Sequence, residues 1–180
     1  MPSVPAVFLF RNIKTSQVLA SVRQNLISDE RRLLKQIQDA TVRPPRIRPD
    51  LWTPMVVAAG FPDSTAAQTL QTILAEPGAP LRQPTPEEVE EHRLMRTPAR
   101  KLKEMNMIES KIAHLCRALI YFGHKSSPIV KDGIKLYWGH PEYQSIIDGK
   151  SLSWPEFVTH DKLSLKRGNI ILNEELKNIE

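Results

Sequence analysis

Three arginines in a proline-rich stretch are the residues best suited to bind a charged partner. Arg43, Arg46 and Arg48 alternate with prolines in the segment RPPRIRPD, and only Asp50 opposes their charge. Proline fixes φ, lacks a backbone donor and favours extended geometry in the preceding residue. A guanidinium is a permanently charged fork of donors that matches phosphate oxygens. The spacing indicates an extended basic arm over residues 43–50 that contacts nucleic-acid phosphates, and a solvated basic loop is an equally good interpretation of the stretch alone.

Further cations and one aromatic residue extend this candidate surface. Trp52 follows the arginines and could stack on a base or on Arg48, although burial against the next strand explains it equally well. Other cations flank two predicted strands near the N-terminus. We therefore predict a nucleic-acid-binding set made of Arg11, Lys14, Arg23, Arg43, Arg46, Arg48 and Trp52.

The net charge favours a polyanionic partner for the first part of the chain. The chain has 25 Lys and Arg against 20 Asp and Glu, a net charge of +5. Residues 1–75 hold nine basic and five acidic side chains, residues 76–100 hold four and five, and residues 101–180 hold twelve and ten. Most of the surplus therefore lies before residue 76, as expected for a protein that binds nucleic acid through its N-terminal portion.

The first 75 residues predict the element order β-β-α-β-α. Apolar runs at 7–10 and 18–22 flank a polar turn and predict a hairpin. Ser28 is a candidate N-cap for a helix whose apolar face includes Leu33 and Leu34. A strand over 55–59 follows the basic arm. Asp63 or Ser64 then caps a second helix.

The remainder of the chain predicts a linker and a helix-rich C-terminal half. Four prolines and a glycine mark 76–86 as linker, and Thr85 with Glu88 predicts a capping box that starts a short acidic helix. Apolar spacing predicts one long helix over 99–122 that Gly123 ends. Farther segments predict a hairpin or extended chain over 129–138, an aromatic covering over 138–157, a strand at 163–165 and a last helix capped by Asn169.

These patterns predict an α+β fold in three parts. Residues 1–75 form a basic β-β-α-β-α domain, and residues 76–98 form a proline-rich linker with the acidic helix. Residues 99–180 form a helical region with an extended aromatic segment. The sequence leaves open whether this last region is a separate domain or packs onto the first.

No residue pattern predicts catalysis, a metal site or a cofactor. His114, Cys116 and His124 could supply three metal ligands, but residues two apart on a helix do not face one another. Cys116 also continues the apolar stripe, so we expect it in the core. Four glutamates within 87–91 are typical of a solvated helix start. HExxH, CxxC, GxSxG and phosphate-binding glycine motifs are absent from the sequence.

The cysteine content and the N-terminus limit the expected compartment. One cysteine cannot form an internal disulfide and fits a reducing environment. No apolar run reaches the length of a membrane span. The first residues lack the charged region of a secretory signal and the Arg and Ser of a transit peptide. We therefore expect any targeting signal to be internal or already removed.

Five segments spread over nearly the whole chain carry a family resemblance. The segments VFLFRN, QVLASV, RPPRIRPDLWTPMVV, LYWGHPEY and KRGNIILNEEL resemble the fungal mitochondrial large-subunit ribosomal protein family. One member of that family is also known as the mitochondrial homologous recombination protein and transcription regulator. The resemblance implies a mitochondrial matrix protein that binds large-subunit rRNA beside neighbouring ribosomal proteins. It implies as an alternative a DNA-binding role in recombination or transcription.

Residues 4–75 also resemble the GIY-YIG nuclease domain. The shared features are the element order and the segment MVVAAGFPDSTAA. Those nucleases need tyrosines on the first strands, an arginine on the first helix and a metal-binding glutamate on the last helix. Here Arg31 or Arg32 could provide the arginine, but Gln71 falls near the glutamate position and the tyrosines are missing. An amide holds a divalent metal weakly, so the resemblance implies a scaffold that binds without cutting.

Overall fold

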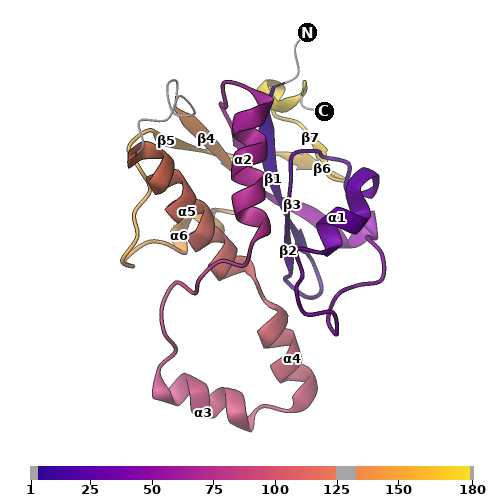
Figure 1. Ribbon diagram of the computed structural model, residues 1–180, viewed down its shortest axis with the longest axis vertical. Helices are drawn as coiled ribbons and strands as arrows, with labels where there is room; N and C mark the ends of the chain where they lie inside the picture. Colours follow the sequence, from indigo (N-terminus) through magenta and orange to yellow (C-terminus); the bar gives the residue numbers. More distant parts are fainter. Residues whose placement is uncertain (1–3, 125–132, 179–180) are drawn as a thin grey trace.

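The computed structural model describes residues 4–124 and 133–178 and has a five-stranded sheet at its centre (Figure 1). The strand order is β2-β1-β3-β4-β5. The strands are β1 (Ala6–Asn12), β2 (Val18–Ser21), β3 (Trp52–Ala59), β4 (Ile134–Trp138) and β5 (Val158–Lys162). Neighbouring strands are antiparallel except β4 and β5, which are parallel. Because β4 pairs with β3, the two halves of the chain share one sheet.

Helices and a small hairpin surround this sheet, so the predicted α+β class is confirmed. The α-helices are α1 (Glu30–Leu34), α2 (Ser64–Ala75), α3 (Pro86–Leu94), α4 (Thr97–Met105), α5 (Ile108–His124) and α6 (Pro141–Ser145). The 3-10 turns are η1 (Ile27–Asp29), η2 (Pro49–Leu51) and η4 (Glu174–Leu176), and β6 (Leu165–Lys166) pairs with β7 (Ile170–Ile171) in the small hairpin.

The sheet is buried on both faces, which explains why β3 is apolar at successive positions. Side chains alternate between faces along a strand. Val56 therefore lies in the core beneath α2 and α5, while Val57 lies in a second core on the opposite face. That second core is covered by α1, by the segment leading to η2, and by the β6–β7 hairpin.

The element order predicted for the first 75 residues is confirmed. Strands β1 and β2 form the expected antiparallel hairpin, and Asp63 caps α2 by accepting a bond from the Ala66 N–H at 2.8 Å. The predicted Ser28 cap is wrong, because the Ser28 hydroxyl donates backwards to the Asn25 carbonyl. The first helix begins only at Glu30 and covers five residues.

Two predictions for the second half are wrong. The long helix over 99–122 is broken between α4 and α5, because the Met107 N–H bonds to Ser16 O at 3.0 Å and the Asn106 side chain caps Ile108. The last helix is replaced by the β6–β7 hairpin. Asn169 has φ +62° in its turn and directs its side chain to β3 rather than to a helix start. Of the hairpin or extended segment predicted over 129–138, residues 129–132 lie outside the described residues, and Ile134–Trp138 forms the strand β4.

Side chains block both outer strands of the sheet. On β2, the Gln36 amide both accepts from the Ala20 N–H and donates to the Ala20 carbonyl, each at 2.8 Å. On β5, the Lys162 N–H bonds to the Asp161 carboxylate and the Lys162 carbonyl accepts from Asn173. Exposed strand edges invite pairing with other chains. These bonds therefore oppose association through β2 or through the C-terminal end of β5.

A fully buried lysine holds the C-terminal end of α2. The Lys111 ammonium donates to the Leu74 carbonyl and to the Glu76 carbonyl, the latter at 2.7 Å, and the side chain has no exposed surface. These carbonyls lie at a helix end that carries partial negative charge, where a cation is favoured. Burial nevertheless lowers the pKa of Lys111 to about 8, because it disfavours the charged form.

The lowered pKa of Lys111 makes stability depend on pH in the alkaline range. Between about pH 8 and the ordinary lysine value of 10.5, the unfolded chain binds a proton that the folded chain has lost. The Lys111 contribution to the free energy of unfolding therefore rises with pH, by about 2 kcal/mol from about pH 7.5 to 9.5. Urea unfolding at both pH values should show this rise relative to Lys111→Met. Parallel changes in the two proteins would contradict it.

Candidate nucleic-acid interface

Two segments remote in sequence form one basic layer on the sheet face opposite α2 and α5. We define the basic layer as residues 23–51, which include α1, and residues 163–173, which include the β6–β7 hairpin. The first segment has seven basic and four acidic side chains, and the second has two basic and no acidic ones. Their combined net charge of +5 equals that of the whole chain. The remaining residues are therefore neutral as a set.

Hydrogen bonds join the two segments of the basic layer to each other and to β3. The Gln24 amide donates to Asn169 O at 3.1 Å. The Asn169 side chain donates to Trp52 O at 2.7 Å and accepts from the Thr53 hydroxyl at 3.0 Å. The hairpin turn is thus fixed beside residue 24 and the start of β3.

The basic arm is fixed to α1 from within the same layer. The Glu30 carboxylate accepts the Ile47 N–H, and the Ile47 side chain is buried in the second core. Arg43 donates to the Ile37 carbonyl at 2.7 Å and to the Gln38 carbonyl at 3.2 Å. Two of the Arg43 donors are therefore used by backbone carbonyls that follow α1, which ties this end of the arm to the α1 region.

The basic layer presents six exposed cations that have no ionic partner. Among the described residues, no carboxylate lies within 4.0 Å of their charged groups. These residues are Arg31, Arg32, Lys35, Arg46, Lys166 and Arg167. A surface of uncompensated, solvated cations attracts a polyanion and releases its counterions on binding. Four of the six come from α1 and the basic arm, and two come from the β6–β7 hairpin.

Two other predicted arginines lie on this layer in weak surface pairs. Arg48 lies 2.9 Å from Asp50 and Arg23 lies 3.8 Å from Asp29, with all four side chains at least 40% exposed. Surface ion pairs of this kind contribute little and exchange readily with solvent. Both arginines can therefore turn to a phosphate at small cost. Arg23 and Arg48 remain candidate contacts together with Arg46.

Of the other two predicted residues, Arg11 lies away from this surface, whereas Lys14 lies in a turn that adjoins it, because the Ile13 N–H donates to Leu51 O at 2.8 Å. The Arg11 guanidinium lies 5.9 Å from the centre of the Tyr143 ring. Tyr143 packs against the core beneath α2 and α5, which places the Arg11 contact away from the basic layer. Lys14 is exposed in the β1–β2 turn.

The alternative of base stacking by Trp52 is corrected by the structure. Trp52 is only 2% exposed, because its side chain packs in the second core under the basic layer. Its ring faces are therefore not accessible to a base.

A hollow of about 130 Å³ opens where the parts of the basic layer meet. Its wall is formed by amides, a proline, a glycine and buried apolar side chains, and it contains no carboxylate. The lining residues are Phe10, Gln24, Asn25, Leu26, Pro49, Trp52, Gly168 and Asn169. Arg23, Arg48 and Arg167 each adjoin one of these residues in sequence. The surface thus combines a shallow recess with cations from both segments of the basic layer.

The described residues show no site for metal chemistry. No three His, Cys, Asp or Glu side chains among them are grouped closely enough to hold an ion. Cys116 is buried and donates to Ser153 O at 3.4 Å, and burial raises the pKa of its thiol to about 11. A thiol protonated at neutral pH is a poor ligand and nucleophile.

Gln71, at the position where the nuclease resemblance requires a glutamate, has a structural role. Its side chain is 5% exposed and donates to the Ala20 carbonyl at 3.1 Å. That carbonyl also accepts from Gln36. The amide N–H therefore helps to bind α2 to the outer strand β2.

Replacing Gln71 with glutamate should destabilise the protein and confer no nuclease activity. A buried carboxylate would face the Ala20 carbonyl without a proton to donate, which costs about 1–3 kcal/mol. Urea unfolding should show the loss, and a magnesium-dependent cleavage assay should stay negative. Gln71→Met, which removes the donor without adding charge, is the matched control. Cleavage of DNA by the glutamate variant would contradict this interpretation.

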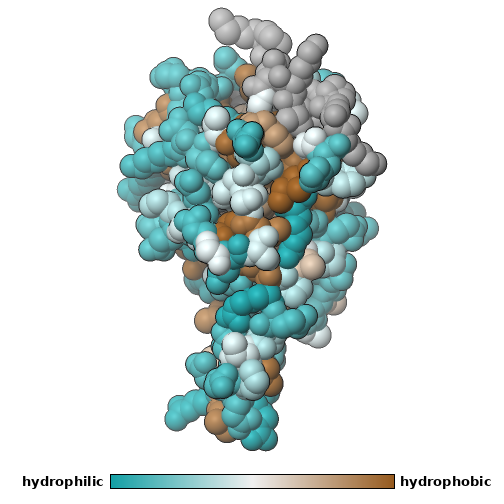
Figure 2. All heavy atoms as spheres, turned by 90° about the vertical axis from the view of Figure 1, so that its left-hand side faces the viewer, coloured by the Kyte–Doolittle hydropathy of each residue, from teal (hydrophilic) through white to brown (hydrophobic). Residues whose placement is uncertain are grey.

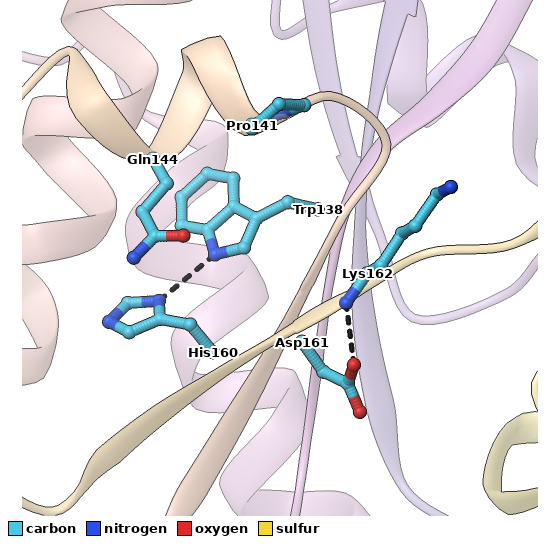
Figure 3. Close-up of a pocket in the computed structure, with 6 residues that line it drawn as sticks. All are labelled: Trp138, Pro141, Gln144, His160, Asp161 and Lys162. Atoms are coloured by element: carbon cyan, nitrogen blue, oxygen red, sulfur yellow. Dashed lines mark hydrogen bonds between the residues drawn. The ribbon is translucent and has the colours of Figure 1, made fainter.

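A second hollow of about 370 Å³ lies beside β5, outside the basic layer (Figure 3). In it the Trp138 indole N–H donates to His160 Nδ1 at 2.9 Å, which leaves the Nε2 of neutral His160 carrying the proton. Burial lowers the pKa of His160, so the ring is neutral near pH 7. Asp161 also lines this hollow, but its carboxylate forms an ion pair with the Lys135 ammonium at 3.0 Å. The hollow contains no activated nucleophile.

A match to a known family supports one part of the resemblance noted from the sequence. Residues 4–76 match the Mhr1 family, described as transcriptional regulation of mitochondrial recombination. The match covers β1 through α2 and so includes the larger segment of the basic layer, but not the β6–β7 hairpin. It supports the recombination and transcription part of the resemblance and neither the ribosomal nor the nuclease part.

Two further findings complete the comparison. No curated protein matches the chain. Among the residues that the structure describes, no helix is both long enough and apolar enough to cross a membrane. Over residues 4–76, the chain is therefore similar to a family of transcriptional regulation of mitochondrial recombination.

Proposed function

We propose that this protein is a mitochondrial DNA-binding protein that acts in recombination or its transcriptional regulation, without catalysing bond cleavage. The observation that carries the proposal is the confinement of the net charge of +5 to one layer of the fold. Phosphate contacts through Arg46, α1 and the hairpin would position the duplex without reading its sequence. The family match over residues 4–76 supports DNA as the partner and mitochondria as the compartment.

The salt dependence of DNA binding tests this proposal. Each phosphate contact releases counterions, and the logarithm of the affinity falls by about 0.9 per contact for each tenfold rise in salt. With six unpaired cations on the layer, the slope should be steep and should vary little between duplexes of different sequence. Fluorescence anisotropy with labelled duplexes over a salt series measures it. A shallow slope, or no binding at low salt, would refute the proposal.

A second candidate function is binding of large-subunit rRNA as a component of the mitochondrial ribosome. The same basic layer would serve, because phosphate contacts do not distinguish the two nucleic acids. The segments outside residues 4–76, such as LYWGHPEY, favour this candidate through the sequence resemblance. Sedimentation of mitochondrial extracts separates the two. DNA binding predicts nucleoid fractions that DNase disperses, whereas ribosomal membership predicts DNase-resistant, stoichiometric cofractionation with the large subunit.

A further inference from the structure

Helices α3 and α4 project below the sheet and bury none of their side chains (Figure 1). We call residues 86–105 the α3–α4 protrusion. Isolated helices of this length are marginal in water, because packing of an apolar face supplies most helix stability. Within the described residues, α3 is supported by the capping box between Thr85 and Glu88, by the Arg82–Glu88 ion pair and by the contact of His92 with Glu104 of α4. The protrusion therefore lacks the burial that would hold both helices in place.

The protrusion exposes apolar side chains that a partner could cover. Leu94 is 72% exposed, Val89 53% and Leu102 49%. Figure 2 shows apolar atoms at the surface of this narrow extension. A hollow of about 430 Å³ also opens between the linker, α3, α4 and the start of α5, and Val89 lines it. Both helices thus offer exposed apolar side chains to a partner.

The two helices carry equal and opposite charge. Residues 86–94 have four glutamates and one arginine, a net charge of −3. Residues 96–105 have four basic side chains and one glutamate, a net charge of +3. When two molecules are related by a two-fold axis, the negative α3 of each molecule can face the positive α4 of the other.

Many of these charges form no close ion pair within the described part of one chain. In the described residues, the one contact within 4.0 Å between a basic and an acidic side chain of α3 and α4 places His92 Nε2 3.1 Å from Glu104. Glu88 and Glu90 pair with Arg82 and Arg93. Six further charged residues have no ionic partner within 4.0 Å there, namely Glu87, Glu91, Arg96, Arg100, Lys101 and Lys103.

We infer that the protrusion binds a second copy of this chain, with α3 of each copy against α4 of the other. A two-fold axis generates every contact twice, so each contact between an acidic residue of α3 and a basic residue of α4 occurs two times in the dimer. DNA does not fit this surface, because the charge of α3 would repel it. A partner of uniform charge would fit only one of the two helices. The dimer would join two basic layers and so raise the avidity for a long duplex.

Charge reversal on the full-length chain tests the dimer by sedimentation velocity. The wild-type protein should be dimeric at micromolar concentrations. Glu87→Lys with Glu91→Lys places positive α3 against positive α4, and Arg100→Glu with Lys101→Glu places negative against negative. Each pair of substitutions should weaken the dimer by about tenfold or more, because like charges face each other across the interface. The control pair Lys150→Glu with Glu156→Lys, which alters exposed residues outside the protrusion, should leave it unchanged.

Experiments that restore opposite charges on α3 and α4 show whether a weakened dimer results from lost charge complementarity or from misfolding. Equal amounts of the two reversed proteins should form a heterodimer, and all four substitutions in one chain should restore the homodimer. Circular dichroism verifies that each variant is folded. A wild-type chain that stays monomeric overturns the inference. So does a dimer that neither reversal weakens, or a mixture of the two reversed proteins that stays monomeric.

Discussion

The double substitution Arg32→Glu with Arg46→Glu is expected to weaken binding of duplex DNA by about ten- to a hundredfold at moderate salt. Each change removes one phosphate contact and adds one repulsion. Both side chains are exposed and unpaired in the basic layer, so neither change should unfold the protein. The salt slope should fall by about 1.8 because two contacts are lost. Fluorescence anisotropy over a salt series measures the affinity and the slope together.

A matched double substitution on the hairpin should have a similar effect. Lys166→Glu with Arg167→Glu alters cations more than 110 residues away in sequence, but on the same layer. Lys150→Glu with Lys162→Glu makes the same change of charge on exposed residues outside the layer, and should alter affinity by less than about threefold. Equal losses from all three double substitutions would mean that only net charge matters. An effect of the arm substitutions without an effect of the hairpin substitutions would restrict the contact to residues 23–51.

Trp52→Ala should produce the largest loss of stability, about 3–5 kcal/mol of unfolding free energy, because it removes a fully buried indole from the second core. The loss should loosen the support of the basic layer, since the indole packs in the second core, which the layer covers. Urea unfolding monitored by far-ultraviolet circular dichroism measures this free energy.

The substitution Trp52→Phe distinguishes a core role from base stacking. Phenylalanine keeps most of the apolar volume, so the folded variant should bind DNA with nearly wild-type affinity. A loss of affinity in a folded Trp52→Phe protein, larger than its loss of stability explains, would show that the indole contacts the nucleic acid.

Local signals in the sequence predicted the first 75 residues well. The polar turn between two apolar runs predicted the β1–β2 hairpin, and Asp63 predicted the start of α2. The capping box of Thr85 and Glu88 was predicted correctly for the same reason, since its two bonds join residues only three apart. Each of these signals depends on neighbours along the chain, which a sequence displays directly.

The two wrong predictions for the second half involve contacts between distant residues. The periodic stripe over 99–122 suggested one helix, but the bond from Met107 to Ser16 ends α4 and starts α5 anew. Asn169 suits a helix cap by residue type, but Gly168 beside it is typical of a turn with positive φ, which the structure shows at both residues. Its side chain instead fixes the hairpin to β3, 117 residues away in sequence.

The sequence predicted only part of the candidate interface, because the rest depends on contacts between residues distant in sequence. The arginine and proline spacing identified Arg46 and Arg48, which the structure leaves on the surface. It could not show that Arg43 donates to the carbonyls of Ile37 and Gln38. The sequence did not indicate Lys166 and Arg167 as candidate contacts, because only the sheet topology brings the C-terminal hairpin beside α1 and the arm.

Photocross-linking of the wild-type protein to duplex DNA, with the linked peptides identified by mass spectrometry, tests the central claim most directly. Cross-links should concentrate in residues 23–51 and 163–173, on both segments of the basic layer. The other cationic segment, residues 96–105, should remain free of them. Cross-links concentrated on α4, or on the face covered by α2 and α5, would contradict the assignment of the basic layer as the DNA-binding surface.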